Sequence, residues 1–247
     1  MIEFNNVTKI YKKTFTAVKN INLKINNGEF IFIVGKSGAG KSTLIKLLLR
    51  EISPTQGIII YNNQDINKIR KRSVAEYRRH IGFIFQDYRL LPKMTVYENI
   101  AFAMEMICCQ AKSIRREVPL VLSMVGLSDK AKYYPDELSG GEQQRVFVAR
   151  ALAQKADCYF LDEPFIGIDA TSENIIINIL RELRNEGKTI FVVHHDLTKV
   201  EGLFDDIILI NKELIGCGPV NQIFVPKLVE EAYDTSLSVL KSLGGVS

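Results

Sequence analysis

The chain has 247 residues, 47% of them hydrophobic and 24% charged, and its formal net charge is +4. That length suits one large α/β domain with a subdomain, and the hydrophobic fraction can fill its core. No apolar run approaches the roughly 20 residues that cross a bilayer, and the first residues lack the pattern of a signal peptide, so we expect a soluble, cytoplasmic protein.

The sequence shows no sign of a disulfide framework or of tethered domains. The four cysteines lack metal-ligand spacing, which favours buried thiols in a reducing compartment over disulfides or a metal site. No repeat, low-complexity tract or Pro- or Gly-rich linker interrupts the chain.

The basic residues are unevenly spread, because residues 68–79 hold six Lys or Arg and one acidic residue. Such a run could contact nucleic acid or an anionic membrane surface. We favour the plainer interpretation of a solvated helix face.

Two strands are predicted before the first motif. Residues 2–8 and 20–25 alternate apolar and polar side chains, as half-buried strands do. We expect them to form an antiparallel layer beside the main sheet. Tyr11 lies between them and could stack on a purine base, although a lone tyrosine more often packs in a core.

The main motif is the glycine-rich stretch at residues 35–42, which follows the apolar run 30–34 and leads into the apolar stretch 43–49. A strand, a turn and a helix in this order aim backbone N–H groups and a helix N-terminus at one spot, which suits a phosphate chain. Lys41 supplies a charge for the phosphates, and Ser42 supplies a hydroxyl for magnesium. The pattern is GxxxxGK[ST], and we expect it to bind a nucleotide.

Residues 57–61 and 81–85 are predicted strands, with a basic helical stretch at residues 73–80 between them. Gln86 follows the second strand, where parallel sheets present ligand-binding side chains, so it is a candidate for contacting magnesium or water. Residues 95–126 are predicted to be helical throughout, with Thr95 as N-cap. A helical block within an α/β pattern indicates a subdomain.

A second glycine turn lies at residues 138–145 and leads into the apolar helix predicted at residues 146–152. It offers a second helix N-terminus that can bind an anion. One chain rarely needs two such sites unless they converge.

Two carboxylates follow the short buried strand predicted at residues 158–161. Adjacent residues on a strand face opposite ways, so Asp162 can reach magnesium while Glu163 polarises a water for attack. Residues 189–193 form another predicted strand, which ends at His194 and His195. The two histidines would not easily share a metal ion, and one of them is better suited to donate a hydrogen bond to a γ-phosphate.

In this order, the motifs resemble those of ATP-binding cassette (ABC) ATPases over nearly the whole chain. The distinguishing piece is Leu-Ser-Gly-Gly-Glu at residues 138–142, here called the signature turn. The resemblance implies an α/β P-loop fold with a RecA-like parallel sheet, an antiparallel β layer and an inserted helical subdomain. It also implies a head-to-tail homodimer in which ATP lies between the phosphate loop of one copy and the signature turn of the other.

The resemblance also implies a role for each site residue. Tyr11 would stack on adenine, Glu163 would be the general base, and His195 the γ-phosphate switch. Lys41 and Gln86 would join them in catalysis, and Asp169 would lie near the dimer seam. Magnesium would be held by Ser42, Gln86 and Asp162. The nucleotide contacts would be Tyr11, Gly35, Lys36, Ser37, Gly38, Ala39, Gly40, Lys41, Ser42 and Thr43 of one copy, with Ser139, Gly140 and Gly141 of the other.

The same resemblance divides the chain into parts. Residues 1–85 and 153–220 would form the nucleotide-binding core with its antiparallel layer, including a hairpin at residues 206–218. Residues 86–137 would form the helical subdomain, and residues 138–152 the signature turn and its helix. Residues 221–247 would form a helical tail with a frayed end.

The two parts of the chain resemble different branches of the family. Residues 1 to about 145, above all 78–92 and 95–101, resemble FtsE, the cell-division ABC ATPase that pairs with the membrane protein FtsX. Residues from about 146 to 247, above all 162–169, resemble ATPases of manganese and zinc importers. FtsE-like proteins usually carry a threonine where this chain has Phe165. We interpret the chain as a mosaic whose join lies near residues 142–147.

The membrane partner is expected from the half that would contact it. In this family the contact is made mainly by residues 86 to about 137, which lie in the FtsE-like half. We therefore expect an FtsX-like partner and a position on the inner face of the cell membrane, with a metal permease as the alternative. A soluble ABC protein acting on nucleic acid or ribosomes is disfavoured, because the chain has one cassette and no long coiled-coil insertion.

Overall fold

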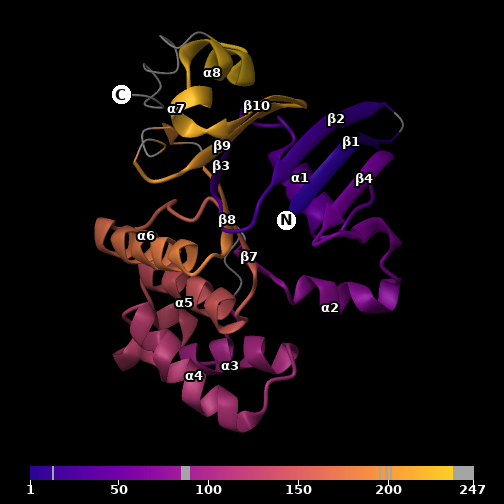
Figure 1. Cartoon of the computed structure of the whole chain (residues 1–247). Helices are drawn as coiled ribbons and strands as arrows, with labels where there is room; N and C mark the ends of the chain where they lie inside the picture. Colours follow the sequence, from indigo (N-terminus) through magenta and orange to yellow (C-terminus); the bar gives the residue numbers. More distant parts are fainter. Residues whose placement is uncertain (13, 85–89, 195, 198–199, 201, 236–247) are drawn as a thin grey trace. The chain divides into compact units, whose positions relative to one another are not determined.

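The structure is a computed structural model, and it describes residues 1–12, 14–84, 90–194, 196–197, 200 and 202–235. The chain forms two compact units (Figure 1): the first comprises Met1–Ala75 and Phe191–Ser247, and the second comprises Glu76–Ile190. The chain passes between them within α2 (Val74–Arg78) and within β8 (Thr189–Val193). The division into core, helical subdomain and tail expected from the sequence follows function rather than compactness, and it stays a prediction.

An antiparallel sheet with strand order β2-β1-β4-β5 belongs to the first unit. β1 pairs with β2 from Ile2 opposite Ile25 to Tyr11 opposite Phe15, and it pairs with β4 on its other side (Figure 1). This is the antiparallel layer predicted from the alternating side chains, with two further strands added to it. The strands are β1 (Ile2–Tyr11), β2 (Phe15–Ile25), β4 (Gln56–Tyr61) and β5 (Gln64–Asp65).

A second sheet of the first unit contains β10, β9, β3 and β8 in that order. β3 and β9 are parallel, and β9 and β10 form the predicted antiparallel hairpin. Every residue of β3 is buried, and the rings of Phe30 and Phe32 lie 4.7 and 4.5 Å from the ring of Phe204. This aromatic cluster anchors the strand that leads into the phosphate loop. The remaining elements are β3 (Phe30–Val34), α1 (Lys41–Leu48), η1 (Ile66–Lys68), η2 (Lys71–Ser73), β9 (Asp206–Asn211) and β10 (Glu213–Pro219).

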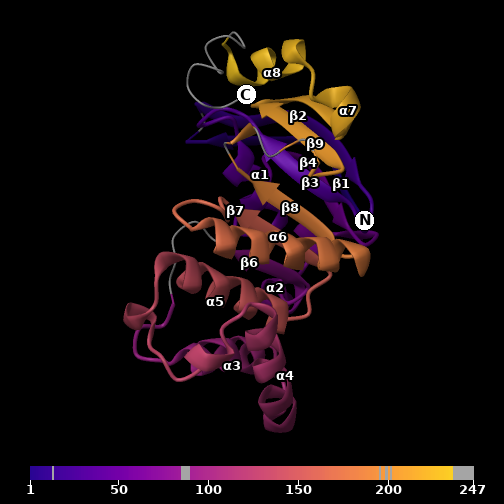
Figure 2. The ribbon, with the colours of Figure 1, turned by 90° about the vertical axis from the view of Figure 1, so that its left-hand side faces the viewer.

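The C-terminal tail, predicted to be helical, contains two short helices in its described part. These are α7 (Val220–Ile223) and α8 (Pro226–Tyr233), and they pack against β9 and β10 (Figure 2). Pro226 begins α8, where its missing N–H costs nothing. Residues 236–247 lie outside the described part of the chain.

The second unit joins two parallel strands to a block of helices. β6 and β7 pair in parallel, and α3, α4 and α5 pack on one another, with α5 also contacting α6 and β6. Within the described ranges, every helix is too short or too polar to span a lipid bilayer. The elements are β6 (Ile81–Ile84), α3 (Val96–Met106), α4 (Ala111–Met124), η3 (Ser128–Lys130), η4 (Pro135–Glu137), α5 (Gly140–Ala153), β7 (Cys158–Asp162) and α6 (Ala170–Asn185).

The prediction of continuous helix over residues 95–126 is wrong, because α3 ends in a closed turn before α4 begins. Cys108 N–H donates to the carbonyl of Glu105 (2.8 Å), and Cys109 N–H donates to that of Met104 (3.0 Å). Cys108 has a φ of 63°, the left-handed conformation that terminates helices.

The cysteines differ from the expectation of buried thiols. Cys108 is exposed, and among the four free cysteines only Cys158 is buried, so the expectation holds for Cys158 alone.

Candidate functional site

The glycine-rich stretch connects β3 to α1 in the first unit, as predicted. Ala39 N–H donates to the carbonyl of Lys36 (3.1 Å), and Leu44 N–H donates to that of Gly40 (2.9 Å) to begin the helix. Gly40 precedes α1 with a φ of 105°, and no side chain in the described structure caps this helix end. The first N–H groups of α1 therefore remain available for an anion, which the helix dipole also favours.

Two glycines of the loop are required by close contacts with neighbouring strands. A Cβ on Gly40 would lie 2.8 Å from the carbonyl oxygen of Ala17 on β2. A Cβ on Gly35 would lie 2.1 Å from the carbonyl oxygen of Ile210 on β9. Backbone oxygens in a sheet cannot move aside cheaply, so glycine at these positions lets the loop pass between the two sheets of the first unit.

Lys41 is half-buried in the first turn of α1, with its side chain folded back over the loop. Its Nζ donates to the carbonyls of Gly35 and Lys36, the second at 3.1 Å. In this structure the loop carbonyls are the acceptors of the ammonium group, and a charged phosphate is a stronger acceptor for it. Ser42 follows with an exposed hydroxyl, the kind of oxygen ligand that Mg²⁺ accepts.

The side chain of Lys36 is engaged elsewhere. Its Nζ forms an ion pair with the carboxylate of Asp234, the residue that follows α8. The hydrogen bond from Lys36 is the main cause that lowers the pKa of Asp234. Lys36 was expected among the nucleotide contacts, and its carbonyl does line the loop, whereas its charge is paired with the C-terminal part of the same unit.

Tyr11 ends β1 in the same unit as the loop, and it is half-buried. Its cross-strand partner is Phe15, whose residue surface is 53% exposed. Residues directly opposite in an antiparallel pair have Cβ atoms about 5 Å apart, so this end of the hairpin offers two aromatic rings. Sequence reasoning missed Phe15, which lies between the predicted strands 2–8 and 20–25, although an aromatic residue four positions after Tyr11 was a usable signal.

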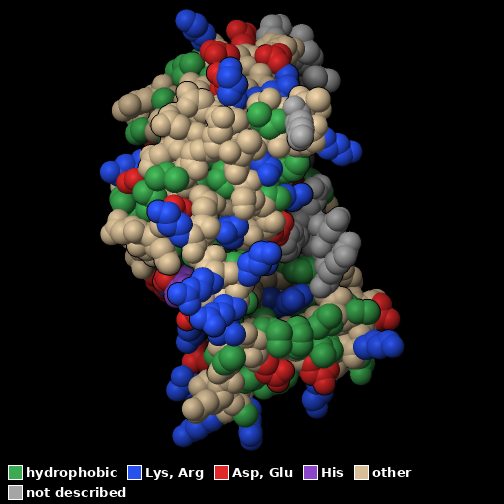
Figure 3. Space-filling model, turned by 90° about the vertical axis from the view of Figure 1, so that its right-hand side faces the viewer, with side chains coloured by type: hydrophobic (Ala, Val, Ile, Leu, Met, Phe, Trp, Pro, Cys, Tyr) green, Lys and Arg blue, Asp and Glu red, His purple; other side chains and the backbone are tan. Residues whose placement is uncertain are grey.

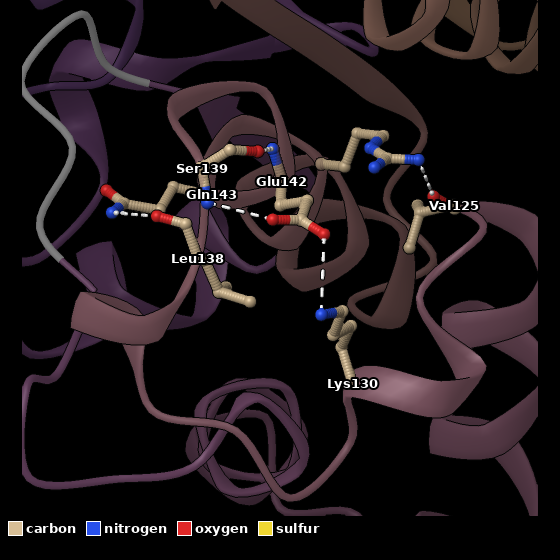
Figure 4. Close-up of polar contacts among 7 residues, drawn as sticks. Val125, Lys130, Leu138, Ser139, Glu142 and Gln143 are labelled. Carbon is tan, nitrogen blue, oxygen red and sulfur yellow. Dashed lines mark hydrogen bonds and ion pairs between the residues drawn. The ribbon is translucent and has the colours of Figure 1, made fainter.

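The signature turn of the second unit is closed by a reciprocal pair of hydrogen bonds (Figure 4). Glu142 N–H donates to Ser139 Oγ (3.3 Å), and Ser139 N–H donates to Glu142 Oε2 (2.8 Å). This is a capping box, which satisfies two backbone donors at the start of α5. The backbone bond from Ser139 is the main cause that lowers the pKa of Glu142.

Three further contacts of neighbouring side chains hold the start of α5 (Figure 4). Lys130 Nζ lies 4.0 Å from Glu142 Oε1, and Gln143 Nε2 donates to the carbonyl of Leu138 (3.2 Å). Arg145 Nη1 donates to the carbonyl of Val125 at the end of α4 (3.2 Å). The N-terminus of α5 is therefore held in one orientation by neighbouring residues of the second unit.

Gly141 lies in the first turn of α5, against the N-terminus of α6. A Cβ at this position would lie 2.4 Å from Asp169 Oδ2 and 2.4 Å from Ser172 Oγ. Asp169 is the N-cap of α6, since its Oδ1 accepts from Ser172 N–H (2.9 Å), and this bond lowers the pKa of the carboxyl. The predicted position of Asp169 near a dimer seam stays a prediction, and its role within the unit is to start α6.

Asp162 is the last residue of β7, and it is half-buried. Glu163 follows with a φ of 53°, so the chain leaves the strand in a left-handed conformation at this residue. Ile166 N–H then donates to the carbonyl of Glu163 (3.4 Å). The two carboxylates therefore flank the point where strand becomes turn, and strand alternation does not by itself decide where Glu163 points.

Gln144 connects the signature helix to this turn. It is 0% exposed, and its Nε2 donates to the carbonyl of Pro164 (3.0 Å). A buried amide bonded to a carbonyl resists displacement, because breaking the bond leaves polar groups unsatisfied. The sequence alone gives Gln144 no role, and only the packing of α5 reveals this one.

The structure distributes the predicted site residues over both units. The first unit carries Tyr11, the phosphate loop and the buried His194, and the second carries the signature turn, Asp162 and Glu163. Gln86 and His195, predicted for magnesium and for the γ-phosphate, lie outside the described residues. Neither unit contains the whole set by itself.

The elements described so far would suit either a general phosphate-binding fold or an ATP-binding cassette. A comparison with known families decides between the two. The family model described as "ABC transporter" matches residues 18–166, which is more than half of the chain. That stretch contains the phosphate loop, the signature turn and the carboxylate pair. The chain belongs to the ABC transporter family. It is accordingly an ATPase of the ABC type, which binds ATP and hydrolyses it to ADP and phosphate.

Both resemblances expected from the sequence occur among the relatives of this ABC ATPase. The cell division ATP-binding protein FtsE of Bacillus subtilis is 41% identical over 215 residues, covering 87% of this chain and 94% of the relative. The manganese transport system ATP-binding protein MntB of Halalkalibacterium halodurans is 40% identical over 244 residues, covering 96% and 94%. The identity reaches 45% over 197 residues for the cell division ATP-binding protein FtsE of Mycobacterium tuberculosis, so the identities are somewhat higher for FtsE than for MntB. The position of the join stays a prediction.

The fold of the ABC ATPase also matches solved cassettes. A dimeric ATP-binding cassette in a post-hydrolysis state, with ADP and phosphate bound, has a TM-score of 0.81 and 33% identity. The match covers 89% of this chain and 99% of the other. The predicted α/β P-loop fold is thereby confirmed.

Proposed function

We propose that this ABC ATPase is FtsE-like and works with an FtsX-like membrane protein in cell division. The observation that carries the proposal is the FtsE resemblance of residues 78–92 and 95–101. These residues lie in or beside the segment 86–137, which is expected to contact the membrane partner. The relative from Bacillus subtilis supports the proposal. The protein would then be peripheral on the inner face of the cell membrane.

The helical block has surface properties that suit a docking role. Met106 of α3 and Leu120 and Met124 of α4 are 56%, 56% and 45% exposed. Leu120 and Met124 are four residues apart on α4 and therefore lie on one face of the helix. Neighbouring exposed apolar side chains of this kind are typical of surfaces that bind another protein. Figure 3 shows hydrophobic side chains at the surface of the part of the molecule where Figure 1 draws α3 and α4.

Co-purification from membranes tests the proposal. The chain is expressed with an FtsX-like protein or with a metal permease, and captured through a tag on the membrane protein. We expect capture by the FtsX-like protein, and at least a tenfold loss when Leu120→Glu and Met124→Glu place charges on α4. The control is Ile58→Glu, which alters a 43% exposed residue of β4. Capture by the permease alone would overturn the proposal.

The second candidate is the ATPase of a manganese or zinc importer. Residues 162–169 favour it, and the alignment with MntB reaches 96% of this chain, against 87% for the FtsE of Bacillus subtilis. It ranks second because the favouring residues lie outside the segment expected to meet the membrane. A neighbouring gene that encodes a permease with many membrane helices would favour the importer over the FtsE-like function.

For the chemistry, the proposed site is formed by two copies of the chain. Lys41 and the loop amides would bind the β- and γ-phosphates, Tyr11 would stack on adenine, and Glu163 would accept a proton from the attacking water. Ser139, Gly140 and Gly141 of the second copy would close the site with the N-terminus of α5. His195 would donate a hydrogen bond to the γ-phosphate.

The side chains present fit a magnesium ion held mainly by the substrate. Within the described ranges no group of three or more His, Cys, Asp or Glu could hold a metal ion. Mg²⁺ in nucleotide sites usually keeps several waters and uses one or two carboxylates together with phosphate oxygens. Ser42, Asp162 and Gln86 would supply the protein ligands, and the bound ion would offset phosphate charge.

A further inference from the structure

A strip of exposed cations, residues 68–72, forms part of the first unit and has no place in the ATPase chemistry. Lys68, Arg70, Lys71 and Arg72 are all exposed. Lys68 Nζ lies 3.6 Å from Asp65 Oδ2 and forms an ion pair with it. Within the part of the chain that the structure describes, the other three form no ion pair. Three cations are therefore presented to solvent within three consecutive residues.

The backbone under this strip is firmly anchored. Ile66 and Ile69 are 0% and 8% exposed and fix the segment to the core. Arg50 Nε donates to the carbonyl of Ile66 (2.8 Å), and its Nη2 donates to that of Asn67 (2.6 Å). A ligand that binds the cations does not have to order the chain first, which removes an entropic cost of binding.

We propose that residues 68–72 bind the surface of an anionic phospholipid membrane directly, without a protein partner. Lys and Arg close to a membrane surface are attracted by its negative potential whatever their exact geometry. Figure 3 looks at the right-hand side of Figure 1, where β4 is drawn, and it shows a number of Lys and Arg side chains on this face.

A lipid surface fits the strip better than a nucleic acid. Proteins that bind single strands place aromatic side chains among their cations, because bases stack on them. Residues 62–76 contain no aromatic residue. A surface of diffuse negative charge requires only the cations, and these are what the strip supplies.

The size of the effect can be estimated from the charge alone. Each Lys or Arg near an anionic surface contributes about 1 kcal/mol, which is about fivefold in the partition coefficient. Removing three such charges is expected to weaken binding by about a hundredfold at low salt. The interaction should weaken at physiological salt, where the Debye length is about 8 Å.

The test is co-sedimentation of the full chain with lipid vesicles. The probes are vesicles of phosphatidylcholine alone and vesicles with one third phosphatidylglycerol. The test variant carries Arg70→Gln, Lys71→Gln and Arg72→Gln. The matched control carries Lys24→Gln, Lys46→Gln and Lys227→Gln, which remove three exposed charges elsewhere in the same unit. Circular dichroism checks that all proteins are folded.

The proposal expects binding to the anionic vesicles only, with a tenfold to hundredfold loss in the test variant and at most a threefold loss in the control. Absence of binding by the unaltered chain would overturn it, as would equal losses in both variants. Binding of a single-stranded oligonucleotide that depends on the same three residues, without vesicle binding, would assign the strip to nucleic acid instead. The FtsX-like partner is absent from this test, so its outcome is independent of the proposed function.

Discussion

Glu163 illustrates how one residue's backbone bears on its chemistry. Its φ of 53° is unfavourable for a side chain with a Cβ, at a cost of about 1 to 2 kcal/mol. Such strained residues occur preferentially at functional sites, where the surroundings enforce them. The turn is enforced here by buried neighbours, including Gln144, which bonds the carbonyl of Pro164. The strain is consistent with Glu163 as the proposed general base.

The first prediction concerns this carboxylate. Glu163→Gln should leave ATP binding intact and lower the rate of hydrolysis by at least a hundredfold, because an amide cannot accept the proton of the attacking water. Equilibrium binding and steady-state phosphate release measure the two effects separately. Unchanged steady-state hydrolysis would exclude Glu163 as the base. Accumulation of an ATP-bound dimer in gel filtration would support the proposed two-copy site.

The second prediction separates binding from turnover. Lys41→Ala should weaken ATP binding itself by more than tenfold. The Lys41 ammonium group, which donates to loop carbonyls in this structure, is expected to donate to phosphate oxygens when ATP is bound. Lys46→Ala is the matched control, since it removes an exposed lysine from the same helix. Titration with a fluorescent ATP analogue measures both variants. Equal affinities in the two would contradict the role of Lys41.

At the scale of elements, helix starts were predicted unevenly. Thr95 was predicted as an N-cap, and its Oγ1 accepts from Glu98 N–H (3.3 Å). The helix α6 was not predicted, although Asp169 and Ser172 show the spacing of an N-cap and the residue it bonds. Its buried face, with Ile176, Ile179 and Leu183, also has helical spacing. The sequence therefore carries a signal for α6 in both its N-cap and its apolar spacing.

The third prediction concerns the start of α5. The pKa of Glu142 is lowered in the folded chain, so its carboxylate stabilises the fold at neutral pH and loses that effect as the pH falls below its ordinary pKa of about 4.3. Glu142→Gln should therefore cost about 0.3 to 1 kcal/mol at pH 7 and progressively less toward pH 3. Urea unfolding across this range measures the difference.

A matched control for this prediction lies in α6. Glu182→Gln removes an exposed glutamate far from the start of its helix. The difference in the free energy of unfolding between this variant and the unaltered chain should not become smaller at low pH in the same way. If the Glu142 variant shows the same free energy difference at every pH, the capping carboxylate does not contribute as the structure indicates.

At the scale of the molecule, the phosphate loop is connected to the C-terminal part of the first unit. Lys212 N–H donates to the carbonyl of Ala39 (2.8 Å), and Lys36 pairs with Asp234 after α8. Asn211 Nδ2 also donates to the carbonyl of Glu231 (3.3 Å). The C-terminal segment is therefore tied to the loop both by charge and through the β9–β10 hairpin.

The fourth prediction tests whether this connection affects the nucleotide. Asp234→Asn removes a negative charge beside the loop and releases the ammonium of Lys36, so ATP affinity should rise by about two- to fivefold at low salt. The double variant with Lys36→Ala should lose the gain, because the released charge is then absent. Calorimetric titration with ATP measures both. Unchanged affinity in Asp234→Asn would show that the ion pair is independent of nucleotide binding.

The phosphate loop, the strand before it and the order of the motifs could be read from the sequence alone. Their chemistry is local: glycine conformations, a helix start and a lysine occupy adjacent positions in the chain. The tertiary structure decided that Gly35 and Gly40 must pass close to β9 and β2, that Gln144 reaches the turn after β7, and that Lys36 meets Asp234. These contacts join residues far apart in sequence, and only packing brings them together.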